Sequence, residues 1–433
     1  MNGDPSIQVR PVPGPGERLV LVAALAFVAM TLLAGPARMY LSLAGLTPLI
    51  YLPNVLMMLA IGRHFHADSR QHGFSAMRLI ALLLPLHAAI IGMQFVSPLQ
   101  TAMGMYVLLP FWFGLCCGPV LLRHWHAAGR VVPALWALAV AGITANQFID
   151  FPWEGFGYAV GDLDVEGSRQ WYATGGGKRL AGFARASFDA AVQVQLLGIL
   201  LTLQLRNRLL RTLAWAMTIA TILPTNSKGV LMVAAVLTPV VLLRSALPES
   251  PLRALPALFG MLGIALPAST LLFTFSSGFS NPALANATFS FYDRLNDMWP
   301  TAWELLRQHG NLLLGRGIGG VGTAQTYFES DLFNAGDNIF MYWFVVFGIA
   351  ALPGFALLML RSLRIRPHAS AEQMRVFCLL LATLVYGTMT NIVENAAFAL
   401  VCGTLVRWLC STPQTGPRRS DHTPLAAGAA ATG

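Results

Sequence analysis

Residues 338–360 read NIFMYWFVVFGIAALPGFALLML and contain no charged side chain. A transmembrane helix needs about 20 consecutive apolar residues to cross the hydrocarbon core of a bilayer. This stretch is long enough to do so, and similar apolar runs recur along most of the chain. The stretch therefore predicts a helix that crosses a membrane.

The composition of the whole chain agrees with this prediction. Of 433 residues, 55% are hydrophobic and only 11% are charged, whereas soluble domains carry about 25% charged residues. So few charges cannot cover a globular surface in water, which excludes most soluble enzymes and disordered scaffolds. The five cysteines lie in or beside apolar runs without metal-ligand spacing, and we interpret them as small core residues.

The apolar runs predict an all-α polytopic membrane protein with about twelve transmembrane helices. The predicted spans are 19–36, 41–62, 78–96, 101–122, 131–149, 187–205, 209–225, 229–243, 254–275, 338–360, 376–389 and 395–409. We expect residues 1–18 to form a cytoplasmic N-terminal tail, residues 19–410 the membrane domain, and residues 411–433 a disordered cytoplasmic tail.

The basic residues indicate how these spans are oriented. With both termini in the cytoplasm, 19 of the 28 Lys and Arg residues fall in cytoplasmic segments, which is the positive-inside pattern. The net charge of +9 then reflects topology and contact with anionic membrane lipids, and no nucleic-acid partner is expected. Two loops on the far side, 150–186 and 276–337, are too long to be simple connectors. We therefore expect any chemistry to face the periplasm or cell exterior.

Several basic residues nevertheless fall on the far side, where positive-inside bias depletes them. They are Lys178, Arg179, Arg185, Lys228, Arg294, Arg307 and Arg316, and the two lysines are the only ones in the chain. One interpretation makes them anchors at the membrane–water interface. The other makes them an outward-facing pocket for a lipid pyrophosphate, whose oxygens accept charge-assisted hydrogen bonds from Arg and Lys. On the second interpretation, Arg179, Lys228 and Arg294 line one cavity.

The second long loop contains a predicted interfacial helix. Apolar residues from Phe291 to Leu306 recur with a helical period, with Trp and charged residues between them, as in an amphipathic helix at a membrane surface. Pro300 would kink this helix or begin a second one. Gly315, Gly317 and Gly320 match a dinucleotide-binding spacing, but no strand precedes them, so we interpret them as loop flexibility.

Two further features are open to a functional interpretation. Asp162, Asp164 and Glu166 could hold a divalent ion, although a solvated acidic loop is favoured. His87 is the clearest ionisable residue inside an apolar span, and we interpret it as a core residue with its hydrogen bonds satisfied. Proton- and ion-coupled transporters bury several charges near the midplane. The near absence of such charges weighs against a transporter.

Three groups of motifs follow one another along the chain. They are the entry to the sixth span, Arg179…Gly182-Phe183…Asp189; the turn Asn226-Ser227-Lys228-Gly229; and a long series made of Phe291-Tyr292-Asp293-Arg294, Trp299, Leu314–Gly319, Gly336-Asp337-Asn338 and Gly348–Ala351. Their order and placement resemble the O-antigen ligase and O-antigen polymerase superfamily. Twelve spans with a large periplasmic loop before the tenth match the ligase branch.

This resemblance implies an inverting, metal-independent glycosyltransferase without a cofactor. Such an enzyme moves a glycan from an undecaprenyl-pyrophosphate-linked donor to an acceptor at the periplasmic face of the bacterial inner membrane. The acceptor is lipid A–core for ligases and another lipid-linked glycan for polymerases. The resemblance makes Asp337 and Arg294 catalytic, and it assigns pyrophosphate binding to Arg179, Arg185, Lys228, Arg294, Lys178, Arg316 and Asn338.

The sequence departs from the family pattern at three positions. Asp337 stands where ligases have His, Lys228 stands where Arg is usual, and Ala351 replaces a final Gly. Asp337 could accept the proton of the acceptor hydroxyl, or it could be the N-cap of the tenth span, and the two roles are compatible. The favoured function is O-antigen ligation. The alternatives are an O-antigen or exopolysaccharide polymerase, another envelope-glycan ligase, and a lipid or polysaccharide transporter.

Overall fold

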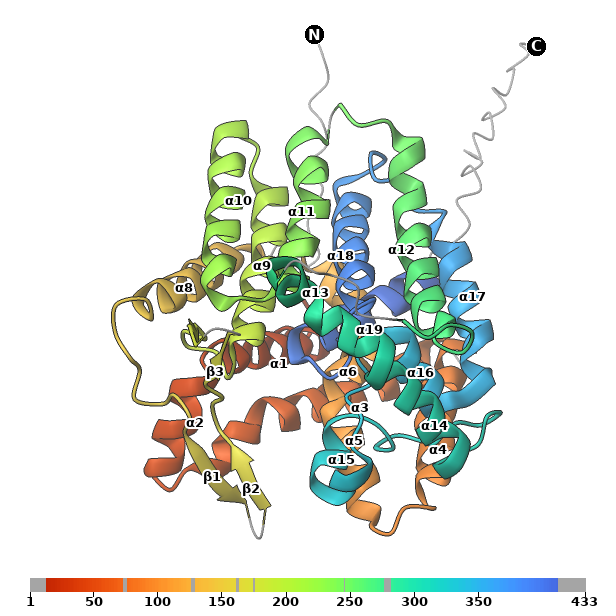
Figure 1. Cartoon of the computed structure of the whole chain (residues 1–433). Coiled ribbons are helices and arrows are strands. Elements are labelled where there is room, and N and C mark those ends of the chain that lie inside the picture. Colours follow the sequence, from red (N-terminus) through yellow and green to blue (C-terminus); the bar gives the residue numbers. More distant parts are fainter. Residues whose placement is uncertain are drawn as a thin grey trace, which may run out of the picture.

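The computed structural model of the chain consists mainly of helices (Figure 1). It describes residues 13–72, 76–125, 129–160, 163–173, 176–244, 246–275 and 282–411. Within these ranges the β-strands form two small antiparallel hairpins, both in the first long loop, and an isolated bridge joins Asn311 to Gly315 in the second. Most of each predicted tail, residues 1–12 and 412–433, lies outside the described residues.

Most of the helices lie where the apolar runs predict them, but the predicted span 41–62 corresponds to a helix over Leu52–His72. Before the first long loop they are α1 (Pro15–Leu32), α2 (Ala34–Leu43), α3 (Leu52–His72), α4 (Ala76–Gly92), α5 (Pro98–Val107), α6 (Leu109–Arg123) and α8 (Val132–Ala145). Between the two long loops they are α9 (Ser187–Gln204), α10 (Arg208–Ile222), α11 (Lys228–Leu243) and α12 (Glu249–Ser269). The last are α16 (Ile339–Phe347), α17 (Ala351–Ser362), α18 (Ala371–Gly387) and α19 (Ala396–Ser411). Each predicted span overlaps one helix or two consecutive helices.

Several of these helices have the length and composition of membrane spans. Among the described residues, four helical segments are long and apolar enough to cross a membrane: Pro15–Leu32, Ser187–Gln204, Glu249–Ser269 and Ile339–Ser362. A fifth is added if α5 and α6, which meet at an angle of 44°, form one bent span. These helices indicate a membrane-associated protein of the all-α class. The number of about twelve spans stays a prediction, because most of the other helices are shorter than a full span.

The tenth predicted span is not continuous. A short 3₁₀ turn, Gly348–Ala350, separates α16 from α17. Gly348 has φ of 62°, and a Cβ at this position would lie 2.5 Å from the carbonyl oxygen of Leu312. The backbone N–H of Ile349 donates to that same carbonyl at 2.8 Å. The second long loop therefore docks against the break between α16 and α17, which only a glycine accommodates.

The glycines after this docking point are conformationally required. Gly315, Gly317 and Gly319 all have positive φ, between 81° and 90°. A Cβ on Gly317 would lie 2.9 Å from the backbone nitrogen of Gly92 in α4, and one on Gly319 would lie 2.5 Å from the carbonyl oxygen of Gln100 in α5. The interpretation of Gly315 and Gly317 as flexible loop residues is therefore wrong, because the loop backbone packs closely against its neighbours at these glycines. Gly320, interpreted in the same way, does not have positive φ.

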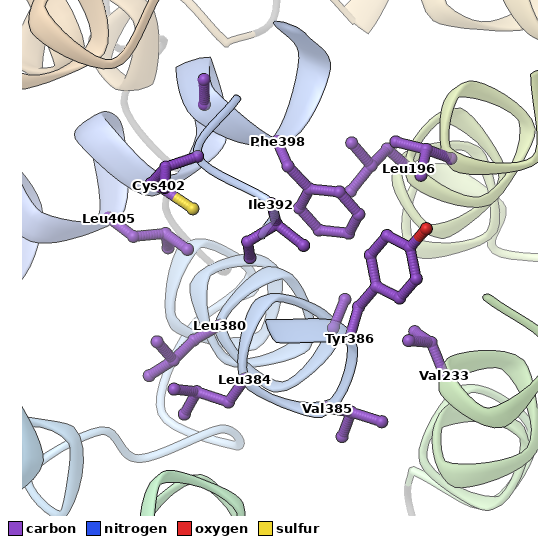
Figure 2. Packing of buried hydrophobic residues seen from close by; sticks show 14 of the residues in the cluster. Leu196, Val233, Leu380, Leu384, Val385, Tyr386, Ile392, Phe398, Cys402 and Leu405 are labelled. Carbon is purple, nitrogen blue, oxygen red and sulfur yellow. The ribbon is translucent and has the colours of Figure 1, made fainter. Parts of the chain in front are cut away.

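The hydrophobic core is centred on α18. This helix packs against α9, α11, α12 and α19, and Figure 2 shows Tyr386 of α18 beside Phe398 of α19, between Leu196 and Val233. α6 and α19 approach each other closely, since a Cβ on Gly403 would lie 2.0 Å from the carbonyl oxygen of Phe111. Small residues at a helix crossing are typical of packing within membranes.

His87 of α4 is packed differently from our prediction. Its ring lies 5.4 Å from that of Phe347 between centroids. Neither ring nitrogen has a hydrogen-bond partner among the described residues, although both nitrogens are buried. The prediction of a satisfied core histidine is therefore wrong in its hydrogen bonding, because the neighbouring ring is apolar.

The two long loops have different structures. The first contains the hairpins β1 (Gly157–Val160) with β2 (Leu163–Glu166) and β3 (Trp171–Tyr172) with β4 (Lys178–Arg179). The second contains α13 (Pro282–Asp293), a π-helical turn (Arg294–Met298), α14 (Trp299–His309) and α15 (Thr323–Phe328). The predicted helix over 291–306 is confirmed as helical, and a second helix begins next to Pro300. The β1–β2 hairpin and α15 both lie at the lower edge of Figure 1, far from the upper ends of α10 and α11.

Candidate functional site

A cavity of about 930 Å³ is formed where the two long loops meet the helices. Its wall includes residues of α1, α2, both loops, the turn before α11, and the connection from α18 to α19. Six basic side chains line it: Arg38, Arg169, Arg179, Arg185, Lys228 and Arg294. Three acidic side chains line it as well: Asp189, Asp337 and Glu394. The cavity is therefore polar and positively charged, and the chain segments that form it are far apart in the sequence.

Arg294 and Asp337 form an ion pair in the wall of this cavity. Arg294 Nη2 lies 2.7 Å from Asp337 Oδ2, and Nη1 of the same guanidinium donates to Ser290. Arg294 begins the π-helical turn between α13 and α14, and π-helical turns occur frequently at functional sites. Burial raises the pKa of Asp337 above its ordinary value, although the charge of Arg294 acts in the opposite direction. The carboxyl group therefore binds a proton more readily than an exposed aspartate does.

Asn338, not Asp337, is the N-cap of α16. Its side-chain oxygen accepts hydrogen bonds from the backbone N–H groups of Phe340 at 2.8 Å and Met341 at 2.9 Å. The capping role considered for Asp337 is therefore wrong, and its side chain is available for Arg294. Asn338 is fully buried, and its side-chain nitrogen donates to the carbonyl oxygens of Gly263 and Thr388. The structure does not bring Asn338 to the cavity, so its predicted contact with pyrophosphate is not supported.

Arg179 and Lys228 come together through the turn before α11. Arg179 Nε donates to the carbonyl oxygen of Thr225 at 3.1 Å, and the turn continues through Asn226, which has φ of 51°. Lys228 then begins α11. The guanidinium of Arg179 also lies over the ring of Trp171, 5.3 Å from its centroid. The prediction that Arg179, Lys228 and Arg294 line one cavity is therefore confirmed; its outward orientation stays a prediction.

Among the described residues, four side chains of the wall have a buried polar atom without a hydrogen-bond partner: Arg169 Nε, Ser227 Oγ, Arg294 Nε and Asn391 Oδ1. Of these, Arg169 Nε lies in an ion pair with Glu166. Buried polar groups in proteins are nearly always hydrogen-bonded, so an unpartnered one needs an explanation. A polar ligand in the cavity would supply the missing partners. These atoms therefore favour ligand binding near Arg294 and the turn before α11.

Arg185, Arg38 and Arg169 form a second basic group in the same cavity. The pKa of Arg185 is lowered by burial and then by the charges of Arg38 and Arg169. Asp189 lines the cavity beside them and accepts a hydrogen bond from Asn395 Nδ2 at 2.8 Å. Our sequence analysis singled out Arg185 but missed Arg38 and Arg169, although both fall on the side where basic residues are depleted.

Glu394 is a buried carboxyl group that sequence reasoning also missed. It accepts hydrogen bonds from the backbone N–H and the hydroxyl of Thr323, at 2.9 Å and 2.7 Å, and from the hydroxyl of Tyr342 at 3.3 Å. Burial raises its pKa to about 7. It links the second long loop to α16 at the cavity wall. The sequence does contain a signal for Glu394, because it is an acidic residue directly before the apolar run 395–409.

Lys178 and Arg316 are predicted ligands that the structure places elsewhere. Lys178 pairs with Asp150 and lies 2.6 Å from Glu154. Arg316 is 2% exposed and pairs with Glu329 at 2.9 Å. Neither residue lines the cavity. Both basic groups are neutralised by acidic neighbours within the protein, so these two predictions of pyrophosphate contact are not supported.

No group of three or more His, Cys, Asp or Glu side chains is arranged to hold a metal ion in the described part of the chain. Glu166, one of the acidic residues considered as a metal ligand, pairs instead with Arg169. Asp162 lies outside the described residues. Comparison of the chain with family models, curated proteins and solved structures finds no match.

Proposed function

We propose that the protein is a glycosyltransferase that transfers a glycan from undecaprenyl pyrophosphate to lipid A–core at the periplasmic face of the bacterial inner membrane. The observation that carries this proposal is the convergence of Arg179, Lys228 and Arg294 on one cavity beside Asp337. Three separate chain segments supply these cations. The proposal also rests on the resemblance of the motifs in these segments to O-antigen ligases.

The cations suit a pyrophosphate leaving group. A pyrophosphate is already activated, so the site has to stabilise the negative charge that grows on it as it departs. Arg and Lys do this through charge-assisted hydrogen bonds. The unpartnered atoms Arg294 Nε and Ser227 Oγ lie in the same wall and are suitable donors to phosphate oxygens.

Asp337 is the proposed proton acceptor. The hydroxyl oxygen of the acceptor attacks the anomeric carbon of the glycan, and the bond from that carbon to the pyrophosphate oxygen breaks. The bonding electrons leave with undecaprenyl pyrophosphate, while the hydroxyl proton passes to the carboxylate of Asp337. One displacement inverts the anomeric configuration. Because burial raises the pKa of Asp337, we expect transfer to increase with pH as this carboxyl group loses its proton.

The proposal includes about twelve spans with both termini in the cytoplasm. Every charged residue of the cavity wall belongs to a segment that the basic-residue distribution assigns to the periplasmic side or its boundary. The apolar part of the wall contains Phe27, Met30 and Val107. These residues would contact the isoprenoid chain of the donor as it enters from the bilayer.

The experiment that tests this function is a transfer assay. Purified protein is incubated with an undecaprenyl-pyrophosphate-linked glycan, with lipid A–core present or absent. Transfer to lipid A–core is the expected result, and lengthening of the glycan without it would instead make the protein a polymerase. No product in either reaction, from protein that melts cooperatively, would contradict the proposal.

Two variants make this assay specific for the site. Asp337→Asn keeps the shape of the side chain and a hydrogen bond from Arg294 but removes the proton acceptor, so we expect a loss of about 10²- to 10⁴-fold in rate. Arg307→Gln is the matched control in the same loop, because Arg307 is exposed and pairs only with Glu304. Full activity of Asp337→Asn would exclude its role as a base.

A further inference from the structure

Arg38, Arg169 and Arg185 lie together at one end of the first long loop. Arg38 Nη1 and Arg185 Nε both donate to the carbonyl oxygen of Glu166, at 3.5 Å and 3.2 Å. The backbone N–H of Arg169 donates to the carbonyl oxygen of Arg185 at 2.7 Å. The guanidinium groups of Arg38 and Arg185 therefore share one acceptor, and the backbone of Arg169 is hydrogen-bonded to that of Arg185.

These arginines keep most of their hydrogen-bonding capacity. A guanidinium has five N–H donors. The carbonyl oxygen of Glu166 accepts from one nitrogen each of Arg38 and Arg185, and the carboxylate of Glu166 pairs with Nε of Arg169. Like charges at close range repel, and an anion that accepts from several of them relieves the repulsion. The three side chains line the cavity, so such an anion has access to them.

This group belongs to other chain segments than the proposed donor site. Arg38 lies in α2, and Arg169 and Arg185 lie in the first long loop, whereas Arg294 and Asp337 belong to the second. A single pyrophosphate is compact and would be held by the group around Arg294. Arg38, Arg169 and Arg185 therefore remain for another anion.

We infer that Arg38, Arg169 and Arg185 form a second anion subsite, which binds a phosphate or carboxylate carried by the acceptor glycolipid. This inference rests on the proposed function, because a transferase must hold two substrates side by side in one cavity. An anchored acidic group would fix the acceptor so that its hydroxyl faces the anomeric carbon. Arginine suits this task, since its planar fork binds both phosphate and carboxylate in a bidentate manner.

The test compares acceptors with and without phosphate groups. Transfer to lipid A–core and to enzymatically dephosphorylated lipid A–core is measured at saturating donor for the wild type, Arg38→Gln and Arg169→Gln. For the phosphorylated acceptor, each variant should raise KM about tenfold or more, as expected for a lost charge-assisted contact. The kcat and the KM of the donor should stay within about twofold of wild type. Arg307→Gln should match the wild type in every respect.

The KM for the dephosphorylated acceptor distinguishes recognition of phosphate from recognition of carboxylate. If phosphate is the group recognised, its removal should raise the wild-type KM and make it insensitive to the two substitutions. If the variants still raise KM for this acceptor, then its remaining carboxylates are the group recognised, and reduction of those carboxylates should abolish the difference. An unchanged acceptor KM in both variants, or a raised donor KM, would overturn the inference.

A binding measurement keeps this test independent of catalysis. The two lipid A–core preparations are titrated into the detergent-solubilised full chain, and binding is followed by microscale thermophoresis. Tighter binding of the phosphorylated form, lost in Arg38→Gln, supports the subsite even if no transfer is observed. Equal binding by wild type and by both variants, which melt at the wild-type temperature, would overturn it.

Discussion

Arg294 and Arg316 lie in the same long loop, and each forms an ion pair with one carboxylate, yet their surroundings differ. Arg316 donates through Nε to the carbonyl oxygen of His309 at 3.1 Å and through Nη1 to that of Gly320, in addition to its pair with Glu329. Arg294 pairs with Asp337 and Ser290, but its buried Nε has no partner. Arg316 is buried away from the cavity, whereas Arg294 lines it.

If the proposed function is correct, this difference distinguishes a structural arginine from a ligand-binding one. All three nitrogens of the Arg316 guanidinium are committed within the protein, and Gln100 Nε2 adds a hydrogen bond to its partner Glu329 at 2.6 Å. This network fixes the loop against α5. Arg294 lines the cavity, and its Nε donor has no acceptor among the described residues. We therefore propose that Arg294 is the binding residue, because it combines an uncommitted donor with a place in the cavity wall, while Arg316 carries the same charge without either.

The largest expected effect is the loss of stability in Arg316→Ala. Removing one partner of a buried ion pair leaves the other charge uncompensated, which costs about 3–5 kcal/mol. We expect a clear fall in the melting temperature of the detergent-solubilised protein, measured by intrinsic tryptophan fluorescence. Arg307→Ala should leave it nearly unchanged, since that pair is exposed to solvent. Equal melting of Arg316→Ala and wild type would remove the structural role given to Arg316.

In contrast to these two ion pairs, the carboxyl group of Glu394 accepts hydrogen bonds from the neutral donors Thr323 and Tyr342. Its pKa in the folded protein is about 7 against an ordinary value of 4.5. The folded state therefore binds the proton more tightly, and stability falls as pH rises from about 4.5 to about 7. The shift corresponds to about 3 kcal/mol at most.

In Glu394→Gln this pH dependence should disappear. Melting temperatures of the wild type and the variant, measured at pH 5 and pH 8, give the comparison. The wild type should lose more stability than the variant between these two values. Parallel behaviour of the two proteins would show that Glu394 does not titrate in this range.

Arg294→Lys tests the other member of the pair through activity. Lysine keeps the positive charge near Asp337 but lacks the planar fork and the Nε donor. We expect transfer to fall about 10- to 100-fold, as for the loss of one charge-assisted hydrogen bond worth about 1.5–3 kcal/mol. The melting temperature should change much less than in Arg316→Ala. If Arg294→Lys lost stability and activity in parallel, Arg294 would be a structural residue like Arg316.

The smallest expected effect is that of metal removal. The cations of the cavity would supply the charge neutralisation that a divalent ion supplies in other transferases. We therefore expect the transfer rate to be the same with and without EDTA. A loss of transfer that Mg²⁺ or Mn²⁺ restores would show that a metal takes part.

The positions of the helices could be predicted from the sequence, and most of the tertiary contacts could not. Apolar runs locate most of the helices to within a few residues, and Pro300 marks the start of α14 at Trp299. The span 41–62 is the exception, because α3 covers Leu52–His72. The break at Gly348 was missed because the run around it is uniformly apolar. It arises from a contact with Leu312 in the preceding loop, and a local pattern contains no information about that contact.

The candidate site could be predicted only in part, because a local sequence pattern does not contain the contacts between distant segments. Arg179, Lys228 and Arg294 could be grouped because each is a basic residue on the side where such residues are rare. Arg316 was grouped with them wrongly, since its partner Glu329 is recognised only once the loop is folded. Glu394 was missed because it lies just outside the apolar run 395–409 that predicts the last span.

The central claim is that the cavity around Arg294 binds a lipid pyrophosphate. The most direct test is the affinity of purified protein for undecaprenyl pyrophosphate, measured by native mass spectrometry for the wild type and for the triple variant Arg179→Gln, Lys228→Gln, Arg294→Gln. Each lost contact is worth about 1.5–3 kcal/mol, so the triple variant should bind at least about a hundredfold more weakly while Arg307→Gln binds normally. Equal affinity of the wild type and a folded triple variant would contradict the account.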